Sequence, residues 1–211
     1  MDRIKAILNS PAPARWLFYG DSITHGALHT YGRRDFTEHF RERVLWEMRR
    51  SGDLVLNSAY SGFTTVELLR DFDFRAAAFR PTVAFVMIGT NDSGRETPPE
   101  EFSRQLGELV DRFAAINCLT VLQTSIPVLR DLISKYRSLP LLAESMRQFA
   151  ARRGVPLVDH FDSWRKDPAE FHLHDDILHP NADGHVKIAH DLFKALGIFD
   201  PETSNVCRFF R

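Results

Sequence analysis

The sequence predicts an α/β fold, with a single doubly wound domain built around a five-stranded parallel sheet. Short apolar segments alternate with helical patterns along all 211 residues, and this alternation is typical of strand–helix–strand units. The strand candidates are apolar at successive positions, as in Val83–Ile88, which indicates strands covered by helices on both faces. No linker-like stretch divides the chain, so residues 1–211 are expected to form one domain. The expected strands are 15–19, 54–57, 82–88, 119–124 and 155–158.

Helical periodicity occupies the intervals between these strands. Apolar residues recur at steps of four from Phe36 to Met48, and those from Val186 to Leu196 gather on one face of a helix. The expected helices are 36–48, about 100–115, about 141–152 and 183–196.

Composition and charge exclude several classes of function. Hydrophobic residues make up 44% of the chain, which is enough to fill a core and excludes a disordered protein. The 27 Lys and Arg residues nearly balance the 28 Asp and Glu residues, giving a net charge of −1. Nucleic-acid binding needs a basic excess, so no nucleic-acid partner is expected.

Apolar runs and cysteines bear on location. The longest clean apolar run, Val83–Ile88, is far shorter than the ~18 to 20 residues that span a bilayer, so no membrane span is expected. Residues 1–11 lack the apolar segment of a secretory signal, which predicts a cytoplasmic chain unless a leader has been removed. With two cysteines a disulfide framework is not expected. Cys118 is expected in the core and Cys207 in a terminal tail.

Polar residues follow four of the five strands, where the carboxyl ends of parallel strands share one edge and ligands gather. Ser22 lies between Gly20 and Gly26 in the first of these turns. A serine hydroxyl needs a base to become a nucleophile, and the base needs an acceptor that orients it. Asp176-x-x-His179 supplies both in one short turn. Taken singly, Ser22 could cap a helix and His179 could be an ordinary loop residue.

An attacked carbonyl also needs donors aimed at its developing oxyanion. Gly62 offers a backbone N–H at close approach, Asn91 offers a side-chain amide, and Ser22 offers its own N–H. Each residue alone is an ordinary turn residue, and the joint occurrence favours catalysis.

These residues resemble, in order and spacing, the four signature blocks of the SGNH (GDSL-type) hydrolases. The blocks are Gly-Asp-Ser at 20–22, Gly62, Gly-Thr-Asn-Asp at 89–92 and Asp-Ile-Leu-His-Pro at 176–180. The resemblance implies an ester or thioester hydrolase with a flavodoxin-like sheet.

The resemblance also implies a role for each matched residue: Ser22 as nucleophile, His179 as base, Asp176 as its partner, and Ser22, Gly62 and Asn91 as oxyanion donors. The second block departs from the family pattern, since Ala59 stands where glycine is frequent. Asp175 precedes Asp176 and could also approach His179, although the three-residue spacing favours Asp176.

Three rival interpretations start from motifs. The segment 89–96 has the glycine spacing of a P-loop, but Arg95 replaces its lysine and Glu96 its serine or threonine. The Gly-x-Ser-x-Gly elbow of the α/β-hydrolases is absent, because Thr24 ends the motif. A ligand-dense segment favours a metal site most seriously, yet Ile177 stands where such a motif has its last histidine. Its candidate ligands are His172, His174, Asp175, Asp176 and His179.

We therefore expect an esterase that works through an acyl-enzyme on Ser22, with a small-molecule ester as substrate, no cofactor and no metal. A non-catalytic carbohydrate- or acyl-binding module would not need Ser22, His179 and Asp176 together. The loops 25–34, 93–99 and 126–139 should shape the pocket, and His172 and His174 should line its mouth. Polar and aromatic side chains in these loops favour a short acyl group such as acetyl, with a sugar-linked alcohol. A thioesterase or lysophospholipase is the alternative if 126–142 forms an apolar groove. The loop residues are His29, Tyr31, Arg33, Arg95, Arg130 and Tyr136.

Overall fold

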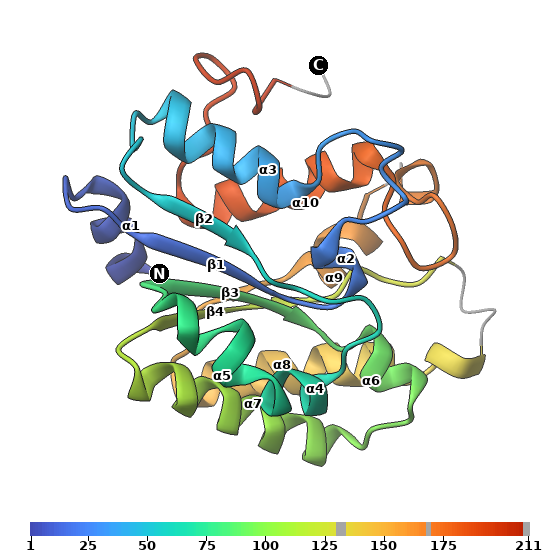
Figure 1. Cartoon of the computed structure of the whole chain (residues 1–211). Coiled ribbons are helices and arrows are strands. Elements are labelled where there is room, and N and C mark those ends of the chain that lie inside the picture. Colours follow the sequence, from blue (N-terminus) through green and yellow to red (C-terminus); the bar gives the residue numbers. More distant parts are fainter. Residues whose placement is uncertain (130–133, 168–169, 209–211) are drawn as a thin grey trace.

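A five-stranded parallel sheet forms the centre of the protein, as predicted (Figure 1). The computed structural model describes residues 1–129, 134–167 and 170–208. The strand order is β2-β1-β3-β4-β5, and every neighbouring pair is parallel. The chain moves outward from β1 to β2 and then crosses to β3, so the loops after β1 and β3 diverge and leave a crevice between them. The strands are β1 (Arg15–Gly20), β2 (Leu54–Asn57), β3 (Val83–Ile88), β4 (Leu119–Thr124) and β5 (Leu157–Val158).

Helices cover both faces of the sheet, with α3 and α10 on one side and α4, α5, α7 and α8 on the other (Figure 1). None of the helices in the described ranges is long and apolar enough to cross a bilayer. The α-helices are α1 (Asp2–Asn9), α2 (Ser22–His25), α3 (Phe36–Arg41), α4 (Thr65–Arg70), α5 (Phe72–Arg75), α6 (Thr90–Gly94), α7 (Pro99–Ala115), α8 (Leu139–Arg153), α9 (His160–Arg165) and α10 (Ala182–Leu196). Shorter or wider turns are η1 (Glu42–Glu47), η2 (Ala77–Phe79), η3 (Ser134–Tyr136) and η4 (Glu170–Leu173).

Strand β1 shows how the two cores form. Successive side chains of a strand point to opposite faces, so Trp16 and Phe18 enter the core under α3 and α10. Leu17 and Tyr19 enter the core under α4, α7 and α8. All four are fully buried, which explains why the strand pattern is apolar at every position and not alternating.

The predicted helix 36–48 is wrong in its second half. An α-helix ends at Arg41 and a π-helix, η1, follows, with the N–H of Met48 donating to the carbonyl of Arg43 at 2.9 Å. The wider turn carries Arg43 inward, where its guanidinium binds the carbonyl of Ile198 at 2.9 Å. Steps of four cannot reveal a five-residue bond, so the period did not predict the break.

Two other boundaries moved for reasons visible in the sequence. Strand β5 begins at Leu157, two residues later than predicted, because Pro156 has no N–H to donate and contributes only its carbonyl, to Leu122. Helix α8 begins at Leu139, earlier than predicted, with Pro140 in its first turn, where a missing N–H costs nothing.

The two cysteines are free and buried. Cys118 packs into the core as predicted. Cys207 does not lie in a loose tail, because the chain after α10 returns over the protein and packs it, 3% exposed, against the other core. Glu47 holds this return through the N–H groups of Asn205 and Val206 at 2.8 and 3.2 Å.

Candidate active site

Ser22 lies at the sheet edge because strand β1 ends in a glycine that approaches its neighbour closely. A Cβ on Gly20 would lie 2.2 Å from the carbonyl oxygen of Met87, so no other residue fits there. Asp21 then caps α2 by accepting the N–H of Ile23 at 3.0 Å. The cap begins the helix at Ser22 and presents its hydroxyl at the start of the first turn.

The structure brings Ser22, His179 and Asp176 together in a hydrogen-bonded chain. Ser22 Oγ lies 3.0 Å from Nε2 of His179, and Nδ1 of the same ring lies 2.9 Å from Oδ2 of Asp176. A carboxylate only accepts hydrogen bonds, so Nδ1 carries the hydrogen of the neutral ring and Nε2 is left to accept the serine proton. This is the arrangement that general-base activation of a serine requires.

The loop between η4 and α10 holds both members of the His–Asp pair. A bridge between His174 and Pro180 closes the loop, and the N–H of Asp175 donates to the carbonyl of His179 at 2.9 Å. Asp176 Oδ1 accepts the N–H groups of Leu178 and His179, both at 2.7 Å. Burial alone would raise the pKa of Asp176, but these bonds outweigh it and hold the pKa below its ordinary value.

The predicted oxyanion donors lie on loops that are bonded to one another. Tyr60 N–H donates to the carbonyl of Gly20 at 3.1 Å, which ties the loop after β2 to the turn before Ser22. Asn91 uses one amide N–H to bind the carbonyl of Phe63 at 3.0 Å, so its second amide N–H stays available for a ligand. Gly62 has φ +86°, a conformation that glycine adopts without strain.

Arg95 supports the glycine loop from outside. Its guanidinium lies 2.7 Å from Glu67 Oε1 and donates to the carbonyl of Gly62 at 3.3 Å. Burial raises the pKa of Glu67, but hydrogen bonds from Thr64 and Arg95 lower it to about 2. Arg95 was predicted to shape the pocket by facing the substrate, and its contacts show instead that it holds the Gly62 loop.

Two buried carboxyl groups, Asp21 and Asp92, lie under the site. Asp92 Oδ1 accepts both the N–H and the hydroxyl of Thr65, at 3.0 and 2.6 Å, and so joins α6 to α4. Burial raises the pKa of Asp92 and raises that of Asp21 to about 7, with the charge of Asp92 adding to the effect on Asp21. The second oxygen of each lacks a hydrogen-bond partner in the described part of the chain.

The histidines expected at the site mouth lie in different environments. His174 is buried, with Nε2 3.1 Å from the carbonyl of Pro127 and its ring edge-on to Trp164. The prediction that it lines the mouth is therefore wrong, because its ring packs inward. His172 is exposed and its carbonyl accepts the amide of Asn181 at 2.8 Å.

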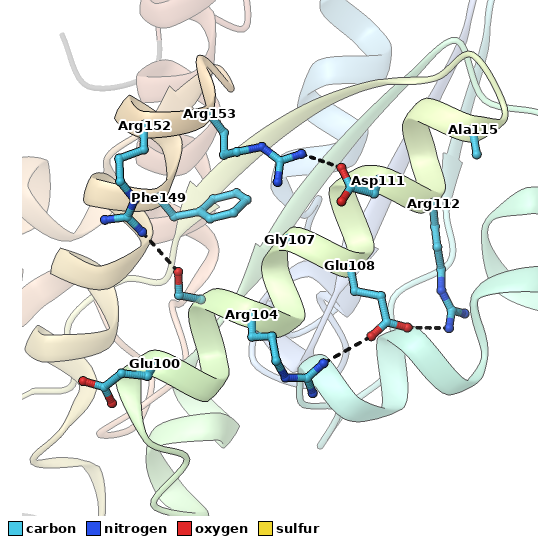
Figure 2. A pocket seen from close by; sticks show the side chains of 11 residues that line it. Glu100, Arg104, Gly107, Glu108, Asp111, Arg112, Ala115, Phe149, Arg152 and Arg153 are labelled. Carbon is cyan, nitrogen blue, oxygen red and sulfur yellow. Dashed lines mark hydrogen bonds and ion pairs between the residues drawn. The ribbon is translucent and has the colours of Figure 1, made fainter.

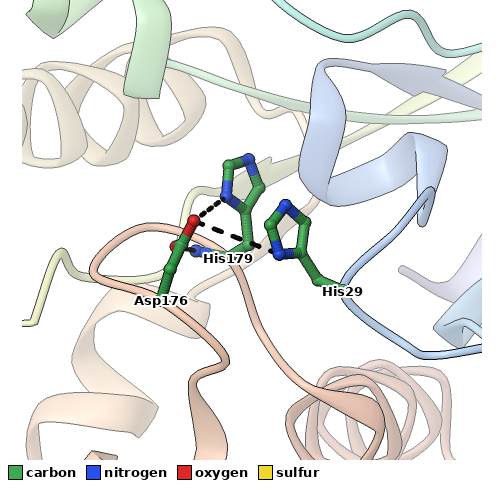
Figure 3. A group of neighbouring side chains, drawn as sticks. All are labelled: His29, Asp176 and His179. Carbon is green, nitrogen blue, oxygen red and sulfur yellow. Dashed lines mark hydrogen bonds and ion pairs between the residues drawn. The ribbon is translucent and has the colours of Figure 1, made fainter.

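The candidate metal ligands are a different set from the one that the sequence suggested. His29, Asp176 and His179 offer ligand atoms within 4.8 Å of one another (Figure 3). The two imidazole rings are stacked with an interplanar angle of 4°, so their in-plane lone pairs run parallel and would converge on one ion only after a ring turned. In the observed geometry the Nδ1 atoms instead bind Asp175 and Asp176.

The pairing of His29 with Asp175 was missed. Asp175 was considered only as a partner for His179, but its Oδ2 lies 2.7 Å from Nδ1 of His29. His29 belongs to the loop between α2 and α3, far away in sequence. The two adjacent aspartates were the one signal in the sequence that a second partner exists.

Other expected pocket residues lie further out. Tyr136 contacts Gly94 and the side chain of Lys135, and Arg33 is exposed. Arg130 lies outside the described residues. A hollow between α7 and α8 is lined by charges that pair with one another, such as Arg153 with Asp111 (Figure 2). None of the residues that line it belongs to the Ser22 site.

Solved structures with the same fold are hydrolases. LAE5, an alpha/beta hydrolase enzyme from the metagenome of Lake Arreo, is 22% identical over 90% of this chain and 97% of its own, with a TM-score of 0.75. Axe2, an acetylxylan esterase from Geobacillus stearothermophilus, is 20% identical over 87% of this chain and 94% of its own, with a TM-score of 0.73. A protein of Parabacteroides merdae described as a GDSL-like lipase is 22% identical over 88% and 96%, with a TM-score of 0.74.

At these identities the solved structures show the fold alone, and none of the curated proteins compared with the chain is a match. The family is shown by a separate comparison, in which residues 18–187 match the model of the GDSL-like lipase/acylhydrolase family. The match contains Ser22, Gly62, Asn91, Asp176 and His179, the residues on which the resemblance was based. The chain therefore belongs to the GDSL-like lipase/acylhydrolase family and is a carboxylic ester hydrolase.

Proposed function

We propose that the protein hydrolyses short-acyl esters, with acetyl on a polar or sugar-linked alcohol as the preferred case, through an acyl-enzyme on Ser22. The observation that carries the proposal is the hydrogen-bonded chain from Ser22 Oγ through His179 to Asp176, at 3.0 and 2.9 Å. Crystal structures of three catalytic mutants of Axe2 change a serine, an aspartate and a histidine, the last two three positions apart. Asp176 and His179 have the same spacing.

In the first half-reaction His179 Nε2 takes the proton of Ser22 as Oγ attacks the ester carbonyl. The tetrahedral oxyanion receives hydrogen bonds from the N–H groups of Gly62 and Ser22 and from the free amide N–H of Asn91. The imidazolium then protonates the departing alcohol, and Asp176 stabilises it without itself taking a proton. The C–O bond to the alcohol breaks and the acyl group stays on Ser22.

In the second half-reaction the same ring takes a proton from water, whose oxygen attacks the acyl carbonyl. The ring returns that proton to Ser22 Oγ as the acid leaves. Every group that these steps require is a side chain or backbone N–H of this chain.

Short-chain specificity is supported by where the apolar residues of 126–142 lie. Ile126, Leu139 and Leu142 are at most 3% exposed and pack into the cores of the protein. A groove for a long acyl chain would need such residues on the surface of the site. Among the described residues of this segment, nothing therefore favours a lysophospholipase or a thioesterase for long-chain substrates.

The test is a panel of p-nitrophenyl esters of increasing acyl length, run beside acetylated sugars and an acyl thioester. We expect kcat/KM to be highest for acetyl and to fall as the chain lengthens. A kcat/KM that rises with chain length, or exceeds the ester rate on the thioester, would replace the proposal with the lipase or thioesterase alternative.

A further inference from the structure

A second histidine–aspartate pair lies directly beside the first. The rings of His29 and His179 are stacked, with centroids 3.9 Å apart and planes 4° from parallel. Nδ1 of His29 lies 2.7 Å from Asp175, just as Nδ1 of His179 lies 2.9 Å from Asp176. Figure 3 shows both rings turning one nitrogen toward Asp176 and the other to the opposite side.

The anchoring of His29 decides what its second nitrogen can do. Hydrogen bonds from His29 and from the hydroxyl of Tyr31 hold the pKa of Asp175 below its ordinary value, so Asp175 is an acceptor for Nδ1–H. The neutral ring of His29 then has its lone pair on Nε2. Within the described residues this atom has no hydrogen-bond partner.

The local backbone indicates that this position is built. His29 lies between Leu28 and Tyr31, which adopt the left-handed region with φ +72° and +50°. Non-glycine residues occupy that region at a cost that the surrounding contacts must offset. Here the contacts that offset it are the bond from His29 to Asp175 and the stacking on His179.

The two outward nitrogens lie on the same side, because the rings are parallel and share an orientation. Nε2 of His179 lies at Ser22 Oγ, where the alcohol oxygen of the ester leaves. Nε2 of His29 therefore faces a point about one ring spacing to the side of that oxygen. In an ester of a vicinal diol, a hydroxyl on the neighbouring carbon occupies a position of this kind.

We propose that His29 is a specificity-determining residue that accepts a hydrogen bond from the hydroxyl vicinal to the scissile ester, so that the preferred substrates are monoesters of vicinal diols. The inference rests on the proposed function and names the alcohol part of its substrate. Sugars and glycerol contain such diols, and simple alkyl alcohols do not.

The test compares kcat/KM for three acetates that differ in one group: 2-hydroxyethyl, propyl and 2-methoxyethyl acetate. Because Nε2 accepts, only the hydroxyl can bond to it. A neutral hydrogen bond contributes about 0.5 to 1.5 kcal/mol, so 2-hydroxyethyl acetate should exceed the other two by about 3- to 10-fold. The matched variants are His29→Phe, which keeps a stacked ring without nitrogens, and His29→Gln, which keeps an acceptor oxygen.

We expect His29→Phe to bring the hydroxyethyl-to-propyl ratio close to one and His29→Gln to retain part of it. His172→Phe, a change of an exposed histidine, should leave the ratio at the wild-type value. If His29→Phe lowers both rates and keeps the ratio, His29 only supports the position of His179 and the inference is overturned. Equal rates on all three acetates in the wild type would overturn it too, while the esterase proposal would stand. Wild-type protein that hydrolyses none of the acetates and resists fluorophosphonate labelling would overturn both.

Discussion

Replacing Asp176 by asparagine tests whether the carboxylate fixes the tautomer of His179. The asparagine side chain can still accept the N–H groups of Leu178 and His179 through its amide oxygen, because both bonds go to Oδ1 of Asp176. Its NH₂ group then faces Nδ1 of the ring, where Oδ2 of the native aspartate accepts at 2.9 Å. A donor at that place stabilises the tautomer with hydrogen on Nε2, and that ring cannot take the serine proton.

The size of the loss follows from two contributions. An ion pair at ~4 Å is worth about 4 kcal/mol at an effective dielectric constant of ~20, and the transition state would lose it. The side chain of Asp176 is 42% exposed, so water screens part of this energy. The wrong tautomer adds to the loss, and the same change in another triad cost about 10⁴ in kcat. We expect kcat to fall by about 10³ to 10⁴.

The assay is steady-state hydrolysis of p-nitrophenyl acetate, with circular dichroism to check the fold. Asp111→Asn, on the α7 surface paired with Arg153, controls for a change of charge away from the site. Asp175→Asn should lose far less than Asp176→Asn, because it touches His29 and not His179. Equal losses in the two neighbouring variants, or a loss below tenfold in Asp176→Asn, would refute the assigned role of Asp176.

Four further outcomes are expected. Ser22→Ala should lower kcat by about 10⁶ with the fold intact and abolish fluorophosphonate labelling, and hydrolysis that persists would remove Ser22 from the mechanism. Asn91→Ala should lower kcat by about 10² to 10³ with little change in KM, whereas a rise in KM alone would make the residue a substrate anchor. Activity should fall with pH as His179 protonates and should survive dialysis against EDTA; loss to the chelator and recovery with zinc would instead indicate a metal mechanism. Asp21→Asn should become more stable relative to wild type as the pH rises from 4 to 8. The folded wild type holds a proton on Asp21 up to its pKa of about 7, and the unfolded chain loses it near 3.8. The difference in unfolding free energy, measured by urea denaturation at several pH values, should reach up to about 4 kcal/mol, and a flat difference would show that the Asp21 carboxyl is not protonated in the folded state.

Much of the fold could be predicted because burial leaves a periodic record in the sequence. Val83–Ile88 is apolar at six successive positions and lies in the middle of the sheet with every residue buried. The π-helix η1 leaves no such record, since Arg43 and Trp46 have the composition of an ordinary amphipathic helix. The return of the chain around Cys207 depends on single contacts, such as Ser204 with Glu47, over a separation of more than 150 residues.

The site divides along the same line. Ser22, Gly62, Asn91 and His179 could be nominated because each sits where a strand ends or a short motif recurs. The contact of His29 with His179 joins residues that no motif connects. Chain topology creates this contact, and composition or spacing cannot predict it.

The position of the site at the crevice between β1 and β3 explains why so many of its contacts run between loops. The loops after β1 and β3 diverge there, so neither can be held by its own strand alone. Asn57, at the end of β2, binds the carbonyl of Thr24 at 2.7 Å and so fixes α2. Asp92 fixes the start of α4 through Thr65, and Asn91 fixes Phe63 next to Gly62. Each bond sets a donor or nucleophile before substrate arrives, and electrostatic stabilisation of a transition state depends on such preorganisation. Changes to Asn57 or Thr65 should therefore lower kcat although neither side chain belongs to the proposed Ser22–His179–Asp176 chain or its oxyanion donors.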